Sequence, residues 1–237
     1  VLNLKDDEPF ILKRSDAYIG VLIDDLVTKG TNEPYRMLTS RAEYRLVLRQ
    51  DNADLRLTPL GYELGLISDK RYQKFKDKKQ AIEEEIKRLR NKEVYPSNEK
   101  VQQYLEELGS SKLNNKDNLA RLIKRPELDY KSLSVIDIDR PDLPYNVREE
   151  VEIQLKYEGY IKKQLKQIKR QNELENKKIP TDIDYNEVES LRLEAKEKLN
   201  KIKPISLGQA SRISGVSPAD ISVLTIYLEQ LERKEVN

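Results

Sequence analysis

Apolar residues recur at spacings of three and four over much of the chain, which is the spacing of amphipathic helices. This pattern predicts a helix over residues 15–29 whose broad apolar face should be mostly buried. A helix that begins after Ser68 carries a heptad-like apolar seam, which predicts an antiparallel partner helix. A short helix with a proline in its first turn is predicted over residues 58–65. Several short helices fit the stretch 95–143, which prolines interrupt, and the longest helix is predicted over residues 146–176. The expected fold class is therefore all-α, a multi-helix bundle.

An arginine row follows a marked helix start near residue 40. Ser40 and Glu43 have the spacing of a capping box, in which each side chain bonds a backbone amide of the first turn. A helix is thus expected from Arg41, and Arg41, Arg45 and Arg49 would share one of its faces. Guanidinium groups match phosphate oxygens with paired donors, so this face can follow an RNA or DNA backbone.

The same arginines allow a second interpretation. Arg36 and Arg56 extend the row, but Glu43, Asp51 and Asp54 lie among the arginines and leave a local charge of only +2. Surface salt bridges, or packing against another domain, fit the spacing at least as well as phosphate contact. Spacing alone does not choose between them.

The long predicted helix contains a segment rich in tyrosine and lysine around Gly159. Tyr157 and Tyr160 stand among Lys156, Lys162 and Lys163, with Glu158 interrupting the apolar side of the helix. Glycine inside a helix costs roughly 1 kcal/mol relative to alanine, so the presence of Gly159 in the predicted helix needs an explanation. One reason is close approach of a phosphate backbone, with the tyrosines stacking on unpaired bases. The other is close packing of a second helix.

Two helix starts near the C-terminus resemble the helix-turn-helix of DNA-binding repressors. Ser206 is expected to cap a helix that runs through Ile213, and Ser217 and Asp220 form a capping box for a second helix. A recognition helix presents polar side chains to base edges, whereas residues 219–228 contain no Arg, Lys, Asn or Gln. The sequence therefore argues against DNA reading.

Apolar residues surround nearly the whole of this last helix. A small terminal subdomain cannot easily bury so much apolar surface alone, and large apolar patches mark interfaces. We therefore expect partner contacts centred on Ile221, Leu224 and Leu228. A purely internal core is the alternative.

Composition narrows the chemistry that this chain can perform. Charged residues make up 36% of its 237 residues and the net charge is +2, which suits long solvated helices and provides no global attraction for nucleic acid. Cysteine and histidine are both absent, which excludes disulfides, zinc–thiolate sites and Ser-His-Asp catalysis within the chain. No glycine-rich phosphate loop, membrane-length apolar run or signal peptide is apparent. We expect no catalytic residue, metal site or cofactor site in this chain.

Four ordered blocks of sequence carry a family resemblance. They are SDAYIGVLIDDLV at residues 15–27, EPYRMLTSRAEYRLVLRQDNADLRLT at 33–58, KYEGYIKKQ at 156–164 and GQASRISGVSPADISVL at 208–224. Together they resemble the C-terminal part of the tRNA uridine 5-carboxymethylaminomethyl modification enzymes, the glucose-inhibited division protein A family. The resemblance covers almost the whole chain, from near residue 9 to near residue 228.

The resemblance implies a function for a longer, cytoplasmic enzyme. In that family a flavin domain, expected before Val1 here, uses FAD and NADH, and the full protein is a homodimer that works with a tRNA-modification GTPase on the wobble uridine of tRNA. The implied organisation is a junction with the arginine-rich helix (residues 1–66), a helical domain (67–163) and a C-terminal subdomain for partner docking (164–237). The family's functional cysteines have no counterpart in this cysteine-free chain.

Residue roles follow from combining the patterns with this resemblance. Contacts with the tRNA backbone are expected from Arg36, Arg41, Arg45 and Arg49, supported by Lys156, Lys162 and Lys163. A helix-turn-helix DNA regulator and a purely structural helical interaction module are the alternatives. A DNA regulator would select duplex sequences, whereas the tRNA interpretation predicts a preference for folded tRNA.

Overall fold

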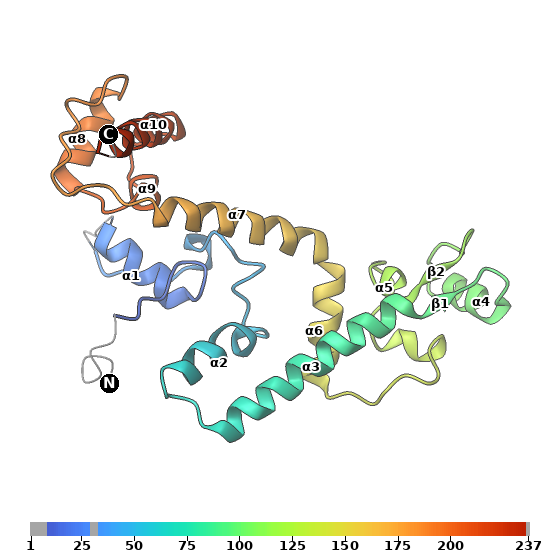
Figure 1. Cartoon of the computed structure of the whole chain (residues 1–237). Coiled ribbons are helices and arrows are strands. Elements are labelled where there is room, and N and C mark those ends of the chain that lie inside the picture. Colours follow the sequence, from blue (N-terminus) through green and yellow to red (C-terminus); the bar gives the residue numbers. More distant parts are fainter. Residues whose placement is uncertain (1–8, 29–32, 236–237) are drawn as a thin grey trace. The chain divides into compact units, whose positions relative to one another are not determined.

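A computed structural model describes residues 9–28 and 33–235 of the chain. Within these residues the chain is mostly helical, with a single small two-stranded sheet, which confirms the all-α prediction (Figure 1). The described residues form two compact units. Unit 1 contains residues 46–163, and unit 2 contains residues 9–45 together with 164–235. Among the described residues of the segment 1–66, those up to 45 belong to unit 2 and those from 46 belong to unit 1.

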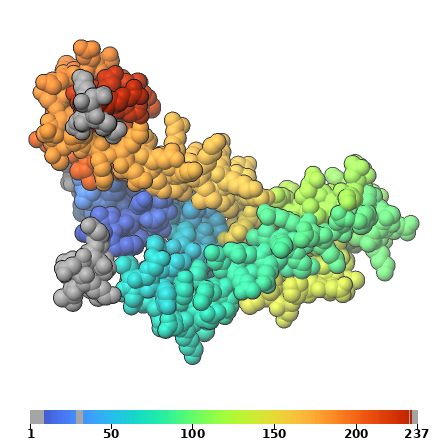
Figure 2. Space-filling view, viewed as in Figure 1, coloured from blue at the N-terminus to red at the C-terminus, as the bar shows by residue number. Residues whose placement is uncertain are grey.

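Helix α3 (Asp69–Asn91) organises unit 1 and begins after Ser68 as predicted. It packs against α2 (Ala53–Glu63), α5 (Leu119–Leu122) and α6 (Tyr145–Lys156). Its buried positions are apolar except for Glu85, and much of the helix lies at the surface in the space-filling view (Figure 2). The apolar seam thus faces three neighbouring helices of the same unit.

Short elements complete unit 1, as the proline-rich stretch predicted. Helix α4 (Glu99–Glu107) starts at Asn98, whose side chain accepts from the Val101 amide, and a 3₁₀ turn, η3, covers Ser132–Val135. Strands β1 (Glu93–Val94) and β2 (Asp117–Asn118) pair antiparallel, with Glu93 opposite Asn118. Leu89, Leu105, Leu119, Leu122, Ile123, Leu133, Val151 and Leu155 form the centre of the core.

The prediction of a helix that starts at Arg41 is wrong. Only the 3₁₀ turn η2 (Thr39–Arg41) forms there, and turns follow it until α2 begins after Asn52. Side-chain N–H groups, and not the backbone amides of a helix, donate hydrogen bonds to the carbonyls of this segment. Arg45 Nε donates to the Ala42 carbonyl at 3.4 Å, Arg49 Nη1 to Leu46 at 2.6 Å and Asn52 Nδ2 to Val47 at 3.0 Å.

Helix α2 starts earlier than the sequence suggested. It begins at Ala53, so Pro59 lies inside the helix and not in its first turn. Gly65 follows the helix with φ of +75°, a left-handed conformation that glycine adopts without steric cost, so the expected end is confirmed.

The long predicted helix is two helices. Helix α6 ends at Lys156, Tyr157 has φ −100° and ψ 11°, and α7 runs from Glu158 to Asn176. Two features favour a break here. Gly159 lowers helix propensity, and Glu158, as the first residue of α7, places a carboxylate at the helix N-terminus, where negative charge is favourable.

Helix α1 (Tyr18–Thr28) buries a different face from the one expected. Val21, Asp25 and Thr28 are buried, whereas the apolar side chains Ile19, Ile23, Leu26 and Val27 are exposed. The buried face is the one that meets the polar network of Arg14 described below. The predicted end of the helix near residue 29 lies outside the described residues.

The C-terminal part of unit 2 has its own apolar core. It is built from α8 (Leu193–Ile202), α9 (Leu207–Ala210) and α10 (Pro218–Glu235) with the loop before them. Ser206 caps α9 by accepting from the Gln209 amide at 3.1 Å, as predicted, but the helix ends at Ala210 and does not reach Ile213. The capping box before α10 is present, because the Ser217 amide donates to Asp220 at 2.8 Å.

Candidate nucleic-acid interface

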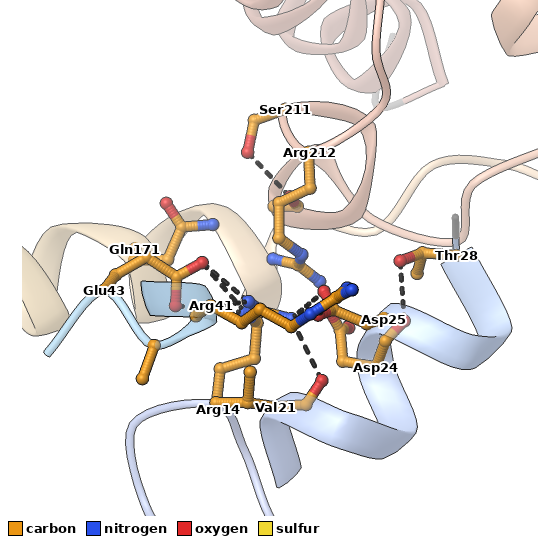
Figure 3. A network of polar contacts seen from close by, with 12 residues as sticks. Arg14, Val21, Asp24, Asp25, Thr28, Arg41, Glu43, Gln171, Ser211 and Arg212 are labelled. Carbon is orange, nitrogen blue, oxygen red and sulfur yellow. Dashed lines mark hydrogen bonds and ion pairs between the residues drawn. The ribbon is translucent and has the colours of Figure 1, made fainter. Parts of the chain in front are cut away.

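A network of ion pairs in unit 2 is centred on the buried guanidinium of Arg14, which sequence reasoning missed (Figure 3). Arg14 Nη1 lies 2.9 Å from Asp24 and 2.7 Å from Asp25, and Nη2 lies 2.7 Å from Glu43. Burial opposes the charge of Arg14, but the hydrogen bonds that Arg14 donates to Glu43 and Asp25 outweigh it and raise the pKa of the guanidinium. Glu43 is therefore an ion-pair partner and not a helix cap.

Arg212 connects this network to the C-terminal part of unit 2. Its Nη2 lies 2.8 Å from Asp24, and its Nη1 pairs with Glu175 on α7. Glu175 also accepts from the Ser206 hydroxyl at 2.9 Å. Residues from α1, α7 and the loop after α9 thus share one set of charges. No motif in the sequence connects these positions, since their carboxylates and guanidiniums are far apart along the chain.

Three of the predicted arginines lie in unit 2, and all three are exposed: Arg36, Arg41 and Arg45. The Arg41 guanidinium stacks 4.3 Å from the centre of the Tyr35 ring and lies 3.9 Å from Asp25. No ion pair joins Arg36 or Arg45 to a carboxylate within the described part of the chain. These two side chains are accessible cations.

Arg49 belongs to unit 1 and has a different environment. Its side chain is only 15% exposed, and Nη2 lies 2.9 Å from Asp51 and 3.0 Å from Glu150. Burial raises the pKa of Glu150, and its hydrogen bond with Asp51 acts in the same direction. The guanidinium of Arg49 stabilises the buried Glu150 and the partly exposed Asp51, so its donors already have partners within unit 1.

The lysines predicted to contact tRNA differ in whether they form ion pairs. Lys156 lies 2.9 Å from Glu152 and Lys162 lies 2.8 Å from Glu158, whereas Lys163 is exposed and has no ion pair among the described residues. The helix-packing interpretation of Gly159 is wrong, because no described atom lies within 4 Å of the position that a Cβ would take. The backbone of α7 is open at this glycine.

Glu158 has two partners that the sequence did not reveal. Arg90 Nη2 lies 3.1 Å from its Oε1, and Lys124 Nζ lies 2.6 Å from its Oε2. Hydrogen bonds from Lys124 and Lys162 lower the pKa of Glu158 to about 2. The one available signal was a charged residue interrupting the apolar side of the long helix, but a pattern within one helix cannot name partners in other elements.

The residues expected at a partner surface lie inside the C-terminal core. Ile221, Leu224 and Leu228 are buried and pack with Leu199, Leu207 and other members of the same cluster. The expectation that this apolar face is exposed is wrong, because α8, α9 and the preceding loop supply enough apolar side chains to cover it. On α10 the large apolar side chain that is exposed is Ile226, at 57%.

The buried carboxylate of Asp220 lies in the first turn of α10 and pairs with the exposed Arg192. Its Oδ2 lies 2.6 Å from Arg192 Nη2 and accepts from the Ser217 hydroxyl at 2.7 Å. The hydrogen bond from Arg192 lowers the pKa of Asp220, with Ser217 contributing in the same direction. This carboxylate fixes the start of α10 and is not presented to a nucleic acid.

A cavity of about 580 Å³ lies in unit 2 between α1, α7 and the loop before α9. Ile23, Val27, Ile168 and Ile205 contribute apolar side chains, and Arg14 and Arg212 border it with their carboxylate partners. The described residues contain no cluster of acidic side chains in a position to hold a metal ion. Nor does any helix among them have the length and apolar character needed to cross a membrane.

Comparison with known proteins gives consistent matches along the chain. Residues 69–165 match the family model of the tRNA modifying enzyme MnmG/GidA C-terminal helical domain, and residues 167–237 match that of the MnmG/GidA C-terminal helical bundle. The tRNA uridine 5-carboxymethylaminomethyl modification enzyme MnmG of Clostridium kluyveri is 62% identical over 99% of this chain, and that of Caldicellulosiruptor saccharolyticus is 63% identical over 98%. This chain spans 37% of the length of each of those relatives.

A solved structure agrees with the sequence matches. Aquifex aeolicus GidA in the form II crystal superimposes with a TM-score of 0.77 and 42% sequence identity, covering 96% of this chain and 35% of that one. The form I crystal of the same protein gives a TM-score of 0.74.

Proposed function

The chain belongs to the MnmG/GidA family of tRNA modifying enzymes, of which it is a C-terminal part, and from this premise we propose that it binds tRNA and a partner protein for the complete enzyme. The complete enzyme is an FAD-dependent protein that, with a GTPase, installs carboxymethylaminomethyl at carbon 5 of the tRNA wobble uridine. It acts in the cytoplasm as a homodimer. The chain described here supplies binding surfaces and no catalytic group.

Accessible cations support the tRNA-binding role. Arg36, Arg41 and Arg45 in unit 2 and Lys162 and Lys163 in unit 1 are exposed, so each can reach a phosphate. Arg41 and Lys162 also lie near the carboxylates of Asp25 and Glu158. RNA backbones attract such side chains, and the affinity falls with salt because counterions are released. Arg49 and Lys156 act indirectly, since their ion pairs hold the surrounding structure.

The cofactors of the complete enzyme are not held by these residues. A dinucleotide binds where a G-x-G-x-x-G turn lets its pyrophosphate approach a helix N-terminus, and this chain has no such turn. We therefore assign no FAD or NADH contact to any residue of this chain. Hydride transfer belongs to the part of the enzyme outside it.

The GTPase partner docks on the C-terminal part of unit 2. Because Ile221, Leu224 and Leu228 form the core, they keep α10 in place, and the contact itself involves the exposed side of the helix around Ile226. Ile226→Asp tests this: it should weaken binding of the GTPase while leaving the helical circular-dichroism spectrum unchanged. Ile138→Asp, at an exposed isoleucine of unit 1, is the matched control.

The tRNA-binding role is tested by removing two exposed guanidiniums. The double variant Arg36→Gln and Arg45→Gln should lower the affinity for a tRNA transcript and reduce the dependence of log K on log salt by roughly one unit per lost contact. The control double variant, Lys198→Gln and Lys201→Gln, removes two exposed charges from α8. Equal behaviour of the two double variants would argue against the arginine surface.

A further inference from the structure

Three cations from separate parts of unit 1 converge on the carboxylate of Glu158. Arg90 comes from the end of α3, Lys124 from the loop after α5 and Lys162 from the first turns of α7. Arg90 Nη2 and Lys162 Nζ lie 3.1 and 2.8 Å from the same oxygen, and Lys124 Nζ lies 2.6 Å from the other. The two groups that share an oxygen are therefore within about 6 Å of each other, which is the scale of one phosphate group with its hydrogen bonds.

The cluster carries an excess of positive charge at an accessible position. One carboxylate among three cations leaves a local charge of +2. The cationic side chains are exposed by 52% for Arg90, 39% for Lys124 and 73% for Lys162, whereas Glu158 is exposed by only 21%. The anion thus lies beneath the cations, and each cation retains donors that face solvent or a ligand.

Stability alone does not account for this arrangement. An exposed ion pair contributes about 0 to 1 kcal/mol, and one cation is sufficient to neutralise Glu158. Adding two more brings like charges close together, which opposes part of that gain. Elsewhere in unit 1 the pairs Lys116–Glu93 and Arg121–Asp117, whose cations are exposed, join one cation to one carboxylate.

The surface beside the cluster has the features of an RNA contact. Tyr157 and Tyr160 flank Glu158 and Gly159 in the chain and both are exposed. Gly159 leaves open space where any other residue would place a side chain. Single-stranded RNA is commonly bound by cations on its phosphates and aromatic rings against its bases. An acidic protein would be attracted by the charge but would make no particular use of the two tyrosines.

We propose that Arg90, Lys124 and Lys162 form a phosphate-binding site for the backbone of tRNA, held in place by Glu158, with Tyr157 and Tyr160 beside it to contact bases. The site rests on the proposed function, because it takes the same ligand. It adds Arg90 and Lys124, which lie outside the resemblance blocks, and gives Glu158 a positioning role. A single carboxylate fixes three flexible side chains before the ligand arrives, which reduces the entropy lost on binding.

The test compares matched double variants of the full chain. Arg90→Gln with Lys124→Gln removes two cations of the cluster, and Arg121→Gln with Lys116→Gln removes one arginine and one lysine from the ordinary surface pairs of the same unit. Binding of a fluorescein-labelled tRNA transcript is followed by anisotropy over a range of salt concentrations. The cluster variant should bind about tenfold more weakly, with the salt dependence reduced by roughly 1.5 to 2 units. Arg90→Lys keeps the charge and should retain most of the salt dependence.

The outcomes separate this site from the wider proposal. If both double variants bind tRNA equally well, the phosphate site is wrong, tRNA binding stands, and the cluster is left as a surface for an acidic protein. If the chain without substitutions does not bind tRNA, the proposed function fails and the site fails with it. Circular dichroism of each variant shows whether the helices are intact.

Discussion

The guanidinium of Arg212 lies 2.8 Å from the carboxylate of Asp24, although 188 positions separate the two residues in the chain (Figure 3). Arg212 also binds Glu175, and Asp24 also binds Arg14, so the pair is one link in a continuous set of ion pairs within unit 2. This set fixes α1 against the loop that follows α9. Much of the polar surface of α1 is buried for this reason.

Arg212→Gln should destabilise unit 2 by about 2 kcal/mol, because it leaves Asp24 and Glu175 with too little positive charge in a partly buried place. The side chain is 13% exposed, which reduces screening by solvent. Urea unfolding followed by far-ultraviolet circular dichroism measures the change. Arg170→Gln, an exposed arginine on α7, is the control and should alter stability by less than about 0.5 kcal/mol. Equal effects of the two substitutions would show that the network adds no stability.

Asp220→Asn should destabilise the C-terminal part of unit 2 by about 2 kcal/mol, since it removes a buried charge from both a capping box and an ion pair. Asn has nearly the same shape, so the loss reports the charge and its hydrogen bonds to Arg192 and Ser217. Ser217→Ala removes the cap alone and should cost about 1 kcal/mol. Thermal unfolding of the three proteins ranks them, and an Asp220→Asn protein as stable as the parent chain would contradict this account of the helix start.

Two glycines should respond oppositely to alanine. A Cβ at Gly208 would lie 2.3 Å from the carboxylate of Glu175, which Arg212 and Ser206 hold in place, so Gly208→Ala should cost about 1 to 3 kcal/mol. Gly159 has open space around it, so Gly159→Ala should raise stability by up to about 1 kcal/mol through helix propensity. Denaturant midpoints test both. Stabilisation by Gly159→Ala together with weaker tRNA binding would assign this glycine to ligand approach.

The sequence predicted features that depend on neighbouring residues well. It did not predict contacts between residues far apart in the chain that replace a local structure. The helix start after Ser68 and the side-chain caps at Ser206 and Ser217 were readable because each depends on residues three or four positions away. The helix from Arg41 failed because Glu43 pairs with Arg14, 29 residues earlier, and because arginine side chains occupy the carbonyls that a helix would use.

The candidate binding residues show the same contrast between local features and contacts with distant residues. Exposure of Arg36, Arg41 and Arg45 agrees with a charged row, but the burial of Arg49 depends on Glu150, which is 101 positions away. An apolar helix surface such as that of α10 does not reveal whether the chain itself covers it. Arg90 and Lys124 could not be found, because their shared partner Glu158 is 68 and 34 positions away.

Acid should weaken the Glu158 cluster over a defined range of pH. Hydrogen bonds from Lys124 and Lys162 lower the pKa of Glu158 in the folded chain from 4.5 to about 2. The group therefore stabilises the fold above pH 4.5, and this contribution is lost as the pH falls from 4.5 through 2. Urea midpoints of the parent chain should fall more steeply over that range than those of Glu158→Gln. Parallel curves would mean that Glu158 titrates alike in the folded and unfolded chain.

Whether this chain binds tRNA through its exposed cations is decided by its affinity for a tRNA transcript, measured across monovalent salt. We predict saturable binding at low salt, a linear fall of log K with log salt of at least roughly 3 units, and weaker binding of duplex DNA with the same number of phosphates. Absence of tRNA binding at low salt, or equal affinity for tRNA and the duplex, would contradict it.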